Sequence, residues 1–303
     1  MQKEDDSHQL VKFPRTRHIF DAGGGVGRDD LVMAKDEARV WYESTVSVEE
    51  KVDGSNLGIS ITPDHKLLFQ NRSHYVNTET QAQWRQLESW AEKHPGLHQV
   101  LTPDRILFGE WLYARHSIHY TNLPDLFLAF DIYDKKKGRF LSRRSRDQLL
   151  EGTGIHTVPL LKNGKLSRAD YEELLNSQSA FHDGVVEGVY VRIDEAIDRQ
   201  DDNVGNELAW VGANEGESKK GKGGKGKAAR GGKAGRARGG AKGGAARAPP
   251  AATTAEADDG GDEGWSYLIQ RAKIVRSDFL PLEDPDVTHW SRQMMVKNIV
   301  RYD

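Results

Sequence analysis

Branched aliphatic residues alternate with polar residues early in the chain, which is the pattern of half-buried β-strands. The alternating apolar positions are Val46, Val48, Val52, Leu57, Ile59 and Ile61. Two short strands are therefore expected on either side of a turn at residues 53–54. A second turn at residues 63–65, with Pro and Asp, would return the chain as a strand over residues 66–70.

Longer apolar runs follow, and they predict central strands, because a strand covered on both faces loses its alternation. These runs lie within residues 106–111, 126–133, 183–192 and 265–276. Helical periodicity and capping residues predict four helices, over residues 79–93, 142–150, from 167 onward, and 287–300. Residues 207–211 are expected to add a short strand.

The order of these elements predicts an α+β fold in which antiparallel β-sheets are flanked by helices. One domain is expected to span residues 1–303. Within it, residues 212–264 are rich in Gly, Ala, Lys and Arg and then in acidic residues, and they cannot bury a core. We therefore predict a disordered insert over residues 212–264.

Charge is distributed unevenly along the chain. The formal net charge is −3, yet residues 219–247 carry eleven Lys and Arg and no acid, so the remainder has 32 − 46 = −14. The basic tract suits sequence-independent contact with phosphates or nuclear targeting, and a solvated expansion without function is the alternative.

Composition excludes several classes of protein. The chain has no Cys, so disulfides and Cys-ligated zinc are excluded. No apolar run reaches about 18 residues, and the acidic N-terminus lacks the apolar stretch of a signal peptide. We expect an intracellular protein, cytoplasmic or nuclear, that is a monomer and has no membrane partner.

Single charged residues interrupt or end the predicted strands. They are, in order, Lys51, Arg72, Glu110, Glu187 and Lys273. A lysine, two carboxylates and two further cations suit nucleotidyl transfer, in which an amine attacks a phosphorus atom, carboxylates hold ribose and metal, and cations neutralise phosphate. Only the neutral amine is nucleophilic, and a nearby Lys273 is expected to lower the pKa of Lys51 by like-charge repulsion.

All of these residues except Arg72 lie in segments that resemble the motifs of covalent nucleotidyltransferases, most closely the RNA ligases related to phage T4 RNA ligase 2. Residues 51–54 resemble motif I, 108–111 motif III, 127–132 motif IIIa, 186–192 motif IV and 271–276 motif V. The resemblance implies a nucleotidyltransferase domain of the ATP-grasp-like type. It also implies an ATP-dependent RNA ligase that uses Mg²⁺ or Mn²⁺.

The reaction that the resemblance implies has three steps. Lys51 takes AMP from ATP, AMP passes to an RNA 5′-phosphate, and a 3′-hydroxyl then displaces AMP to seal a nicked or broken RNA strand. Other roles follow from matched motif positions. Glu110 would bind ribose, Phe130 would stack on adenine, Glu187 would bind the metal, and Lys273 would contact the α-phosphate.

Four further site residues are expected. Glu50 would help read adenine, Asn56 would act near the reacting phosphate, and Arg72 would bind ribose or phosphate. Arg271 stands where the family often has a lysine, and because a planar guanidinium differs from an ammonium, its contact in the site is open.

Two alternatives share parts of this pattern. DNA ligation or capping-type nucleotidyl transfer would use the same chemistry, although only about 25 residues follow the motif V segment, too few for an OB-fold. A non-catalytic RNA-binding protein on a decayed ligase fold is the second alternative, and the full set of Lys51, Glu110, Glu187 and Lys273 speaks against it.

Overall fold

The structure is a computed structural model that describes residues 10–23, 31–196, 264–279 and 294–301. Residues 1–205 together with 264–303 cluster into one compact unit. The insert predicted over residues 212–264 lies outside the described residues, apart from Gly264, and so does the strand predicted over 207–211. Within the described residues, no helix is long and apolar enough to cross a membrane.

The first of two antiparallel sheets, called sheet A here, has the strand order β10-β9-β1-β8. Its strands are β1 (Val46–Lys51), β8 (Leu160–Gly164), β9 (Gly188–Asp194) and β10 (Leu268–Val275). β1 lies in the middle because it pairs with β8 on one side and β9 on the other. The predicted alternation holds here, since Val46 and Val48 are buried against the core of this sheet.

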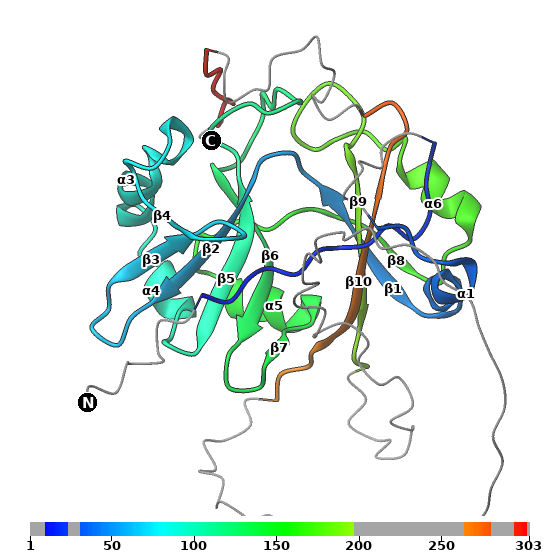
Figure 1. Ribbon diagram of the computed structural model, residues 1–303, viewed down its shortest axis with the longest axis horizontal. Coiled ribbons are helices and arrows are strands. Elements are labelled where there is room, and N and C mark those ends of the chain that lie inside the picture. Colours follow the sequence, from blue (N-terminus) through cyan, green and yellow to red (C-terminus); the bar gives the residue numbers. More distant parts are fainter. Residues whose placement is uncertain (1–9, 24–30, 197–263, 280–293, 302–303) are drawn as a thin grey trace, which may run out of the picture. The chain divides into compact units, whose positions relative to one another are not determined.

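Sheet B has the order β4-β3-β2-β5-β6-β7. Its strands are β2 (Ser55–Ile61), β3 (Leu67–Gln70), β4 (Tyr75–Val76), β5 (Arg105–Trp111), β6 (Phe127–Asp134) and β7 (Arg139–Phe140). Figure 1 shows the two sheets side by side. Residues 52–54 carry the chain from β1 in sheet A to β2 in sheet B, so the predicted nucleophile Lys51 lies where the chain leaves one sheet for the other.

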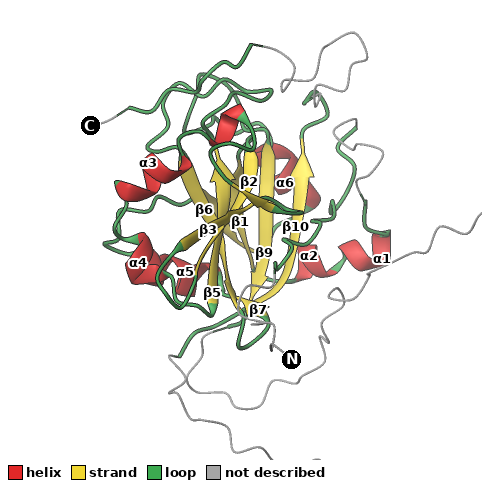
Figure 2. Cartoon of the chain, turned by 60° about the vertical axis from the view of Figure 1, so that its left-hand side comes forward, coloured by secondary structure: helices red, strands yellow, loops and turns green. Residues whose placement is uncertain are grey.

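Short helices lie outside the strands, as Figure 2 shows. They are α1 (Lys35–Ala38), α2 (Val40–Glu43), the 3₁₀ helix η2 (Ala82–Trp84), α3 (Leu87–Glu92), α4 (Leu97–Val100), α5 (Arg143–Leu150) and α6 (Arg168–Leu174). Leu87, Trp90 and Leu97 pack into the core of sheet B, whereas Trp41 and Tyr171 pack into the core of sheet A. The mixture of antiparallel sheets and flanking helices confirms the predicted fold class.

The helix predicted over residues 79–93 is split into η2 and α3. The backbone carbonyl of Gln83 accepts a 2.7 Å hydrogen bond from the Trp111 indole on β5. This carbonyl is therefore bonded to sheet B where a continuous helix would bond it to its own next turn. Both predicted caps of the later helices are present. The Ser142 hydroxyl accepts from Ser145 N at 3.1 Å, and Ser167 forms a capping box with Asp170.

The prediction of a helix over residues 287–300 is wrong for residues 294–300, the part of that range that the structure describes. Residues 294–301 are extended and dock on the loop that follows β5. Arg115 N donates to Val296 O at 2.8 Å, and Leu123 N donates to Ile299 O at 3.1 Å. These carbonyls therefore have partners in another segment instead of in a helix.

Candidate active site

A cavity of about 470 Å³ opens between the two sheets at the point where β1 passes to β2. Seven of the nine residues predicted for the site line it: Glu50, Lys51, Asn56, Arg72, Glu110, Phe130 and Lys273. An eighth predicted residue, Glu187, does not line the cavity but contacts Lys51, whose Nζ lies 2.5 Å from Glu187 Oε1. Side chains that are up to about 220 residues apart in the sequence thus meet at one place.

The charge around Lys51 differs from the sequence prediction. Burial alone lowers its pKa, but the negative charges of Glu187, Glu110 and Asp53 outweigh burial and raise the pKa of Lys51 above its ordinary value. The expectation that Lys273 would lower the pKa of Lys51 is therefore wrong for this arrangement. In the protein alone, the carboxylates hold Lys51 as an ammonium ion.

The two predicted carboxylates are themselves perturbed. Burial, opposed mainly by the positive charge of Lys51, raises the pKa of Glu110 and of Glu187 to about 7 each. Glu110 Oε1 also accepts a 3.1 Å hydrogen bond from Gly54 N. Three titrating groups with perturbed pKa values in one cavity are the behaviour expected of a functional site.

The turn between β1 and β2 requires a glycine at position 54 for lack of space. A Cβ atom on Gly54 would lie 2.6 Å from the Trp111 carbonyl oxygen and 2.8 Å from a Leu112 methyl carbon. Asp53 is fixed by hydrogen bonds to Oδ2 from Ser117 N at 2.6 Å and Ile118 N at 3.1 Å. The hydrogen bonds of Asp53 thus hold the turn between β1 and β2 against the segment that follows β5.

Glu50 lies beside Lys51 and is held from another direction. Its carboxylate accepts from the Ser179 hydroxyl at 2.6 Å and from Ala180 N at 3.2 Å. Burial raises its pKa above the ordinary value, although these two hydrogen bonds oppose the shift. With its carboxylate oriented by two donors, Glu50 presents a fixed group at the wall of the cavity.

Aromatic rings form a further wall that the sequence only partly indicated. The ring centroids of Phe130 and Tyr190 lie 6.1 Å apart, and those of Phe130 and Phe13 lie 5.3 Å apart. All three residues line the cavity, together with Thr16 and Gln83. Tyr190 belongs to the motif IV segment and could have been found there, whereas Phe13, Thr16 and Gln83 gave no signal in the sequence.

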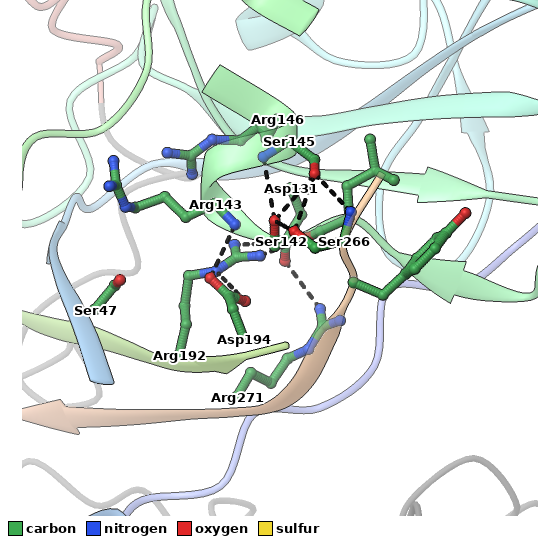
Figure 3. Close-up of polar contacts among 12 residues, drawn as sticks. Ser47, Asp131, Ser142, Arg143, Ser145, Arg146, Arg192, Asp194, Ser266 and Arg271 are labelled. Atoms are coloured by element: carbon green, nitrogen blue, oxygen red, sulfur yellow. Dashed lines mark hydrogen bonds and ion pairs between the residues drawn. The ribbon is translucent and has the colours of Figure 1, made fainter. Parts of the chain in front are cut away.

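Asp131 is the centre of a buried polar cluster behind this wall, drawn in Figure 3. Its Oδ2 accepts from the Tyr190 hydroxyl at 2.8 Å and from Arg271 Nη1 at 3.0 Å, and its Oδ1 pairs with Arg192. Arg192 and Asp131 are fully buried. Asp131 therefore links β6 of sheet B to β9 and β10 of sheet A.

Arg271 does not line the cavity. It is on the same face of β10 as Lys273, but it pairs with Asp131 and its guanidinium carbon lies 3.8 Å from the Phe140 ring centroid. The same carbon lies 4.9 Å from the Phe13 ring centroid. Arg271 is thus surrounded by partners beneath the aromatic wall, while the catalytic role expected for it stays a prediction.

A metal ion would have few protein ligands here. No group of three or more His, Cys, Asp or Glu side chains among the described residues could hold a metal. However, Glu187 Oε2 is buried and has no hydrogen-bond partner, and the same is true of Asn56 Oδ1. A site with one carboxylate suits Mg²⁺ or Mn²⁺, because Mg²⁺ commonly keeps waters and shares its remaining positions with substrate phosphates.

Comparison with protein families identifies the family of the chain. The family model for RNA ligase matches residues 44–207, more than half of the chain, and this range contains Lys51, Glu110 and Glu187. The chain belongs to the RNA ligase family. None of the curated proteins compared with this RNA ligase family member matches it.

Solved structures of an RNA ligase from Naegleria gruberi are similar to this RNA ligase family member. A mutant with ATP and manganese is 20% identical, with a TM-score of 0.44, and the match covers 59% of this chain and 58% of that one. The same ligase with pyrophosphate is 22% identical, with a TM-score of 0.41, and the match covers 61% and 58%. The chain thus spans less than two thirds of the length of the ligases it matches.

Proposed function

We propose that this protein is an ATP-dependent RNA ligase that seals 3′-hydroxyl and 5′-phosphate ends through lysyl-AMP and RNA-adenylate intermediates. The observation that carries the proposal is the meeting of Lys51, Glu110, Glu187 and Lys273 around one cavity. Membership of the RNA ligase family supports the same reaction. ATP and a divalent cation, Mg²⁺ or Mn²⁺, would be its substrate and cofactor, and RNA its partner.

In the first step, the Nζ lone pair of Lys51 would attack the α-phosphorus of ATP. A nitrogen–phosphorus bond forms, the bond from the α-phosphorus to the bridging oxygen breaks, and pyrophosphate leaves with the electron pair. Lys51 must lose its proton before it attacks. The carboxylates that raise its pKa therefore have to be neutralised or engaged elsewhere when ATP is bound.

The cavity offers suitable partners for the rest of the nucleotide. Phe130 presents a ring for the base, Glu110 a carboxylate for the ribose hydroxyls, and Lys273 an ammonium for the α-phosphate. Arg72 is exposed at the rim, where it would meet ribose or phosphate oxygens. Asn56 Oδ1, which lacks a protein partner, would act near the reacting phosphate in the later steps.

A divalent cation would be held by Glu187, through the oxygen that Lys51 does not use. When bound, it would neutralise negative charge on the phosphate oxygens as charge moves to pyrophosphate. Glu187 itself keeps Lys51 oriented, since its Oε1 fixes Nζ at 2.5 Å. The lysine is thereby placed before nucleotide enters.

Covalent labelling tests the proposal. Protein is incubated with ATP labelled in the α-phosphate and with Mg²⁺ or Mn²⁺, as wild type, Lys51→Ala and Lys137→Ala. Lys137 is an exposed lysine that does not line the cavity, so its variant is the matched control. We expect acid-labile label on wild type and Lys137→Ala and at least a 100-fold reduction, on the order of the effect of removing a nucleophile, in Lys51→Ala. Equal labelling of Lys51→Ala contradicts the proposal.

The same protein preparations also test which nucleotide donor and which nucleic-acid acceptor the protein uses. Labelled ATP and GTP are compared as donors, and nicked RNA and nicked DNA as acceptors. ATP and RNA are the expected pair. Labelling by GTP alone indicates a capping-type enzyme, sealing of DNA alone indicates a DNA ligase, and absence of labelling by any donor indicates an RNA-binding protein without catalysis.

A further inference from the structure

An N-terminal segment crosses the cavity between the two sheets. We call residues 10–20 the strap. Figure 1 shows it in dark blue, running from the side of β3 across β6 to β10. It lies outside residues 44–207, the part of the chain that the RNA ligase family model matches. The strap contributes Phe13 and Thr16 to the lining of the cavity.

Both ends of the strap are held in place. At its start, the side-chain amide of Gln70, the last residue of β3, donates to Val11 O at 2.8 Å. At its end, Lys273 N donates to Arg17 O at 2.9 Å and Ile19 N donates to Lys273 O at 3.1 Å. Ile19 and Phe20 are then buried in the core of sheet A. The strap is therefore tied to sheet B at one end and to sheet A at the other.

Phe13 lies at the middle of the strap and is 6% exposed. Its ring centroid lies 5.1 Å from that of Phe108, 5.3 Å from that of Phe130 and 5.6 Å from that of Phe140. The Phe13 and Phe130 rings meet at 69°, an edge-to-face geometry that aromatic pairs favour. Phe13 therefore adds a second aromatic surface next to the residue proposed to stack on the base.

We propose that the strap completes the nucleotide site, with Phe13 as a base-contacting residue beside Phe130 and with the strap backbone holding Lys273. The proposal deepens the proposed function and rests on it. It assigns part of the base subsite to a segment outside the matched family region. The ligand part that Phe13 recognises is a planar purine base, not the phosphates.

The physical argument has two parts. A purine base is a flat apolar surface with polar edges, and two rings at an angle remove more of that surface from water than one ring does. Lys273, in turn, is hydrogen-bonded to the strap through both its N–H and its C=O. Its side chain lines the cavity, so the strap fixes the backbone from which this cation projects.

The chain offers a matched control for the test. Phe140 packs against Phe13, Phe108 and the Arg271 guanidinium, but it does not line the cavity. Phe13→Leu and Phe140→Leu therefore remove a ring from the same aromatic cluster, and only the first removes it from the cavity wall. Equilibrium binding to each variant is measured with two probes, ATP and inorganic tripolyphosphate, which has phosphates but no base.

We expect Phe13→Leu to weaken ATP binding by roughly 2- to 10-fold, the fold-change that corresponds to one aromatic contact. Binding of tripolyphosphate should be unchanged, and Phe140→Leu should bind both probes as wild type does. Thermal unfolding checks that the variants are folded. If Phe13→Leu does not fold, Phe13→Met, whose flexible unbranched side chain adapts to the space but also lacks a ring, gives the same comparison.

Two results overturn the proposal. Unchanged ATP binding by Phe13→Leu or Phe13→Met shows that Phe13 does not contact the base. Equal weakening of ATP and tripolyphosphate shows general damage to the site instead of a base contact. Failure of the proposed function looks different, because wild type itself would then neither bind ATP nor take label from it.

Discussion

Three carboxylates act on Lys51 through their charge, and this charge governs when its amine can react. Two opposite effects act on its pKa: burial lowers it, and Glu187, Glu110 and Asp53 raise it. The second effect wins, so the neutral fraction of Lys51 at physiological pH is smaller than for a lysine in water. Removal of one carboxylate charge should shift this balance toward the neutral amine.

Glu187→Gln tests this balance, since glutamine keeps an oxygen beside Nζ and removes the charge. We expect a lower pKa for Lys51, so its amine becomes reactive at a lower pH than in wild type, because the neutral form appears as pH rises through the pKa. Trace acetylation of the nucleotide-free, metal-free protein over a pH series, read from the Lys51 peptide by mass spectrometry, measures the midpoint. Glu172→Gln, an exposed acid on α6, is the control. An unshifted midpoint would mean that Glu187 does not govern Lys51.

Individual residues were predictable from the sequence where a charge broke an apolar pattern. Lys51, Glu110 and Glu187 each interrupt or end such a run, and each is found at the cavity. Phe13 and Gln83 were not predictable, because nothing local distinguishes a cavity-lining aromatic or amide from a core or surface one. Their role depends on long-range packing that a single sequence does not display.

At the scale of elements, the C-terminal segment 294–301 supports the turn that follows Lys51. Asn298 is buried, its Oδ1 accepts from Tyr120 N at 3.0 Å, and its Nδ2 donates to Leu112 O at 2.8 Å. The Tyr120 hydroxyl in turn accepts a 2.7 Å hydrogen bond from Asp53 N. A chain of hydrogen bonds thus runs from the C-terminal segment to the residue two positions after Lys51.

Asn298→Ala should loosen this support. It leaves a buried N–H and C=O without partners, which costs about 1–3 kcal/mol of the free energy of unfolding per group. We expect a lower melting temperature and, in protein that is still folded, slower adenylylation of Lys51 with little change in ATP binding. Asn176→Ala removes an exposed asparagine that donates to Glu172 O at 3.0 Å, and it should have neither effect. A normal adenylylation rate in folded Asn298→Ala would show that the reactivity of Lys51 does not depend on the C-terminal segment.

The same segment shows why sequence patterns misassign elements. Its apolar residues suggested a helix, but an extended segment that docks along a loop gives a similar spacing over so few residues. The strands were predicted more reliably, because β1, β5, β6 and β9 each bury several aliphatic residues in a row or in alternation. For residues 294–301, the deciding factor is where the backbone hydrogen bonds go, and those partners lie about 180 residues away.

For the whole molecule, the long connection between β9 and β10 begins and ends at adjacent points. Leu268 pairs with Asp194 in the antiparallel register, and Glu195 N donates to Tyr267 O at 2.9 Å. A short turn could therefore replace the connection without moving either strand. The basic tract within this connection, residues 219–247, contrasts with the rest of the chain, whose formal charge of −14 would repel a polyanion.

Deletion of residues 216–262 tests whether the tract serves RNA. We expect adenylylation of Lys51 to be preserved, because the pairing of β9 with β10 is kept. RNA binding at low salt should weaken, and the slope of log affinity against log salt should decrease by about 0.7–0.9 for each RNA phosphate that the protein no longer neutralises. A full-length variant with the eleven Lys and Arg of residues 219–247 changed to Gln separates charge from length and should behave like the deletion. An unchanged affinity and slope in both variants would exclude the tract from RNA binding, since counterion release must fall when fewer phosphates are neutralised.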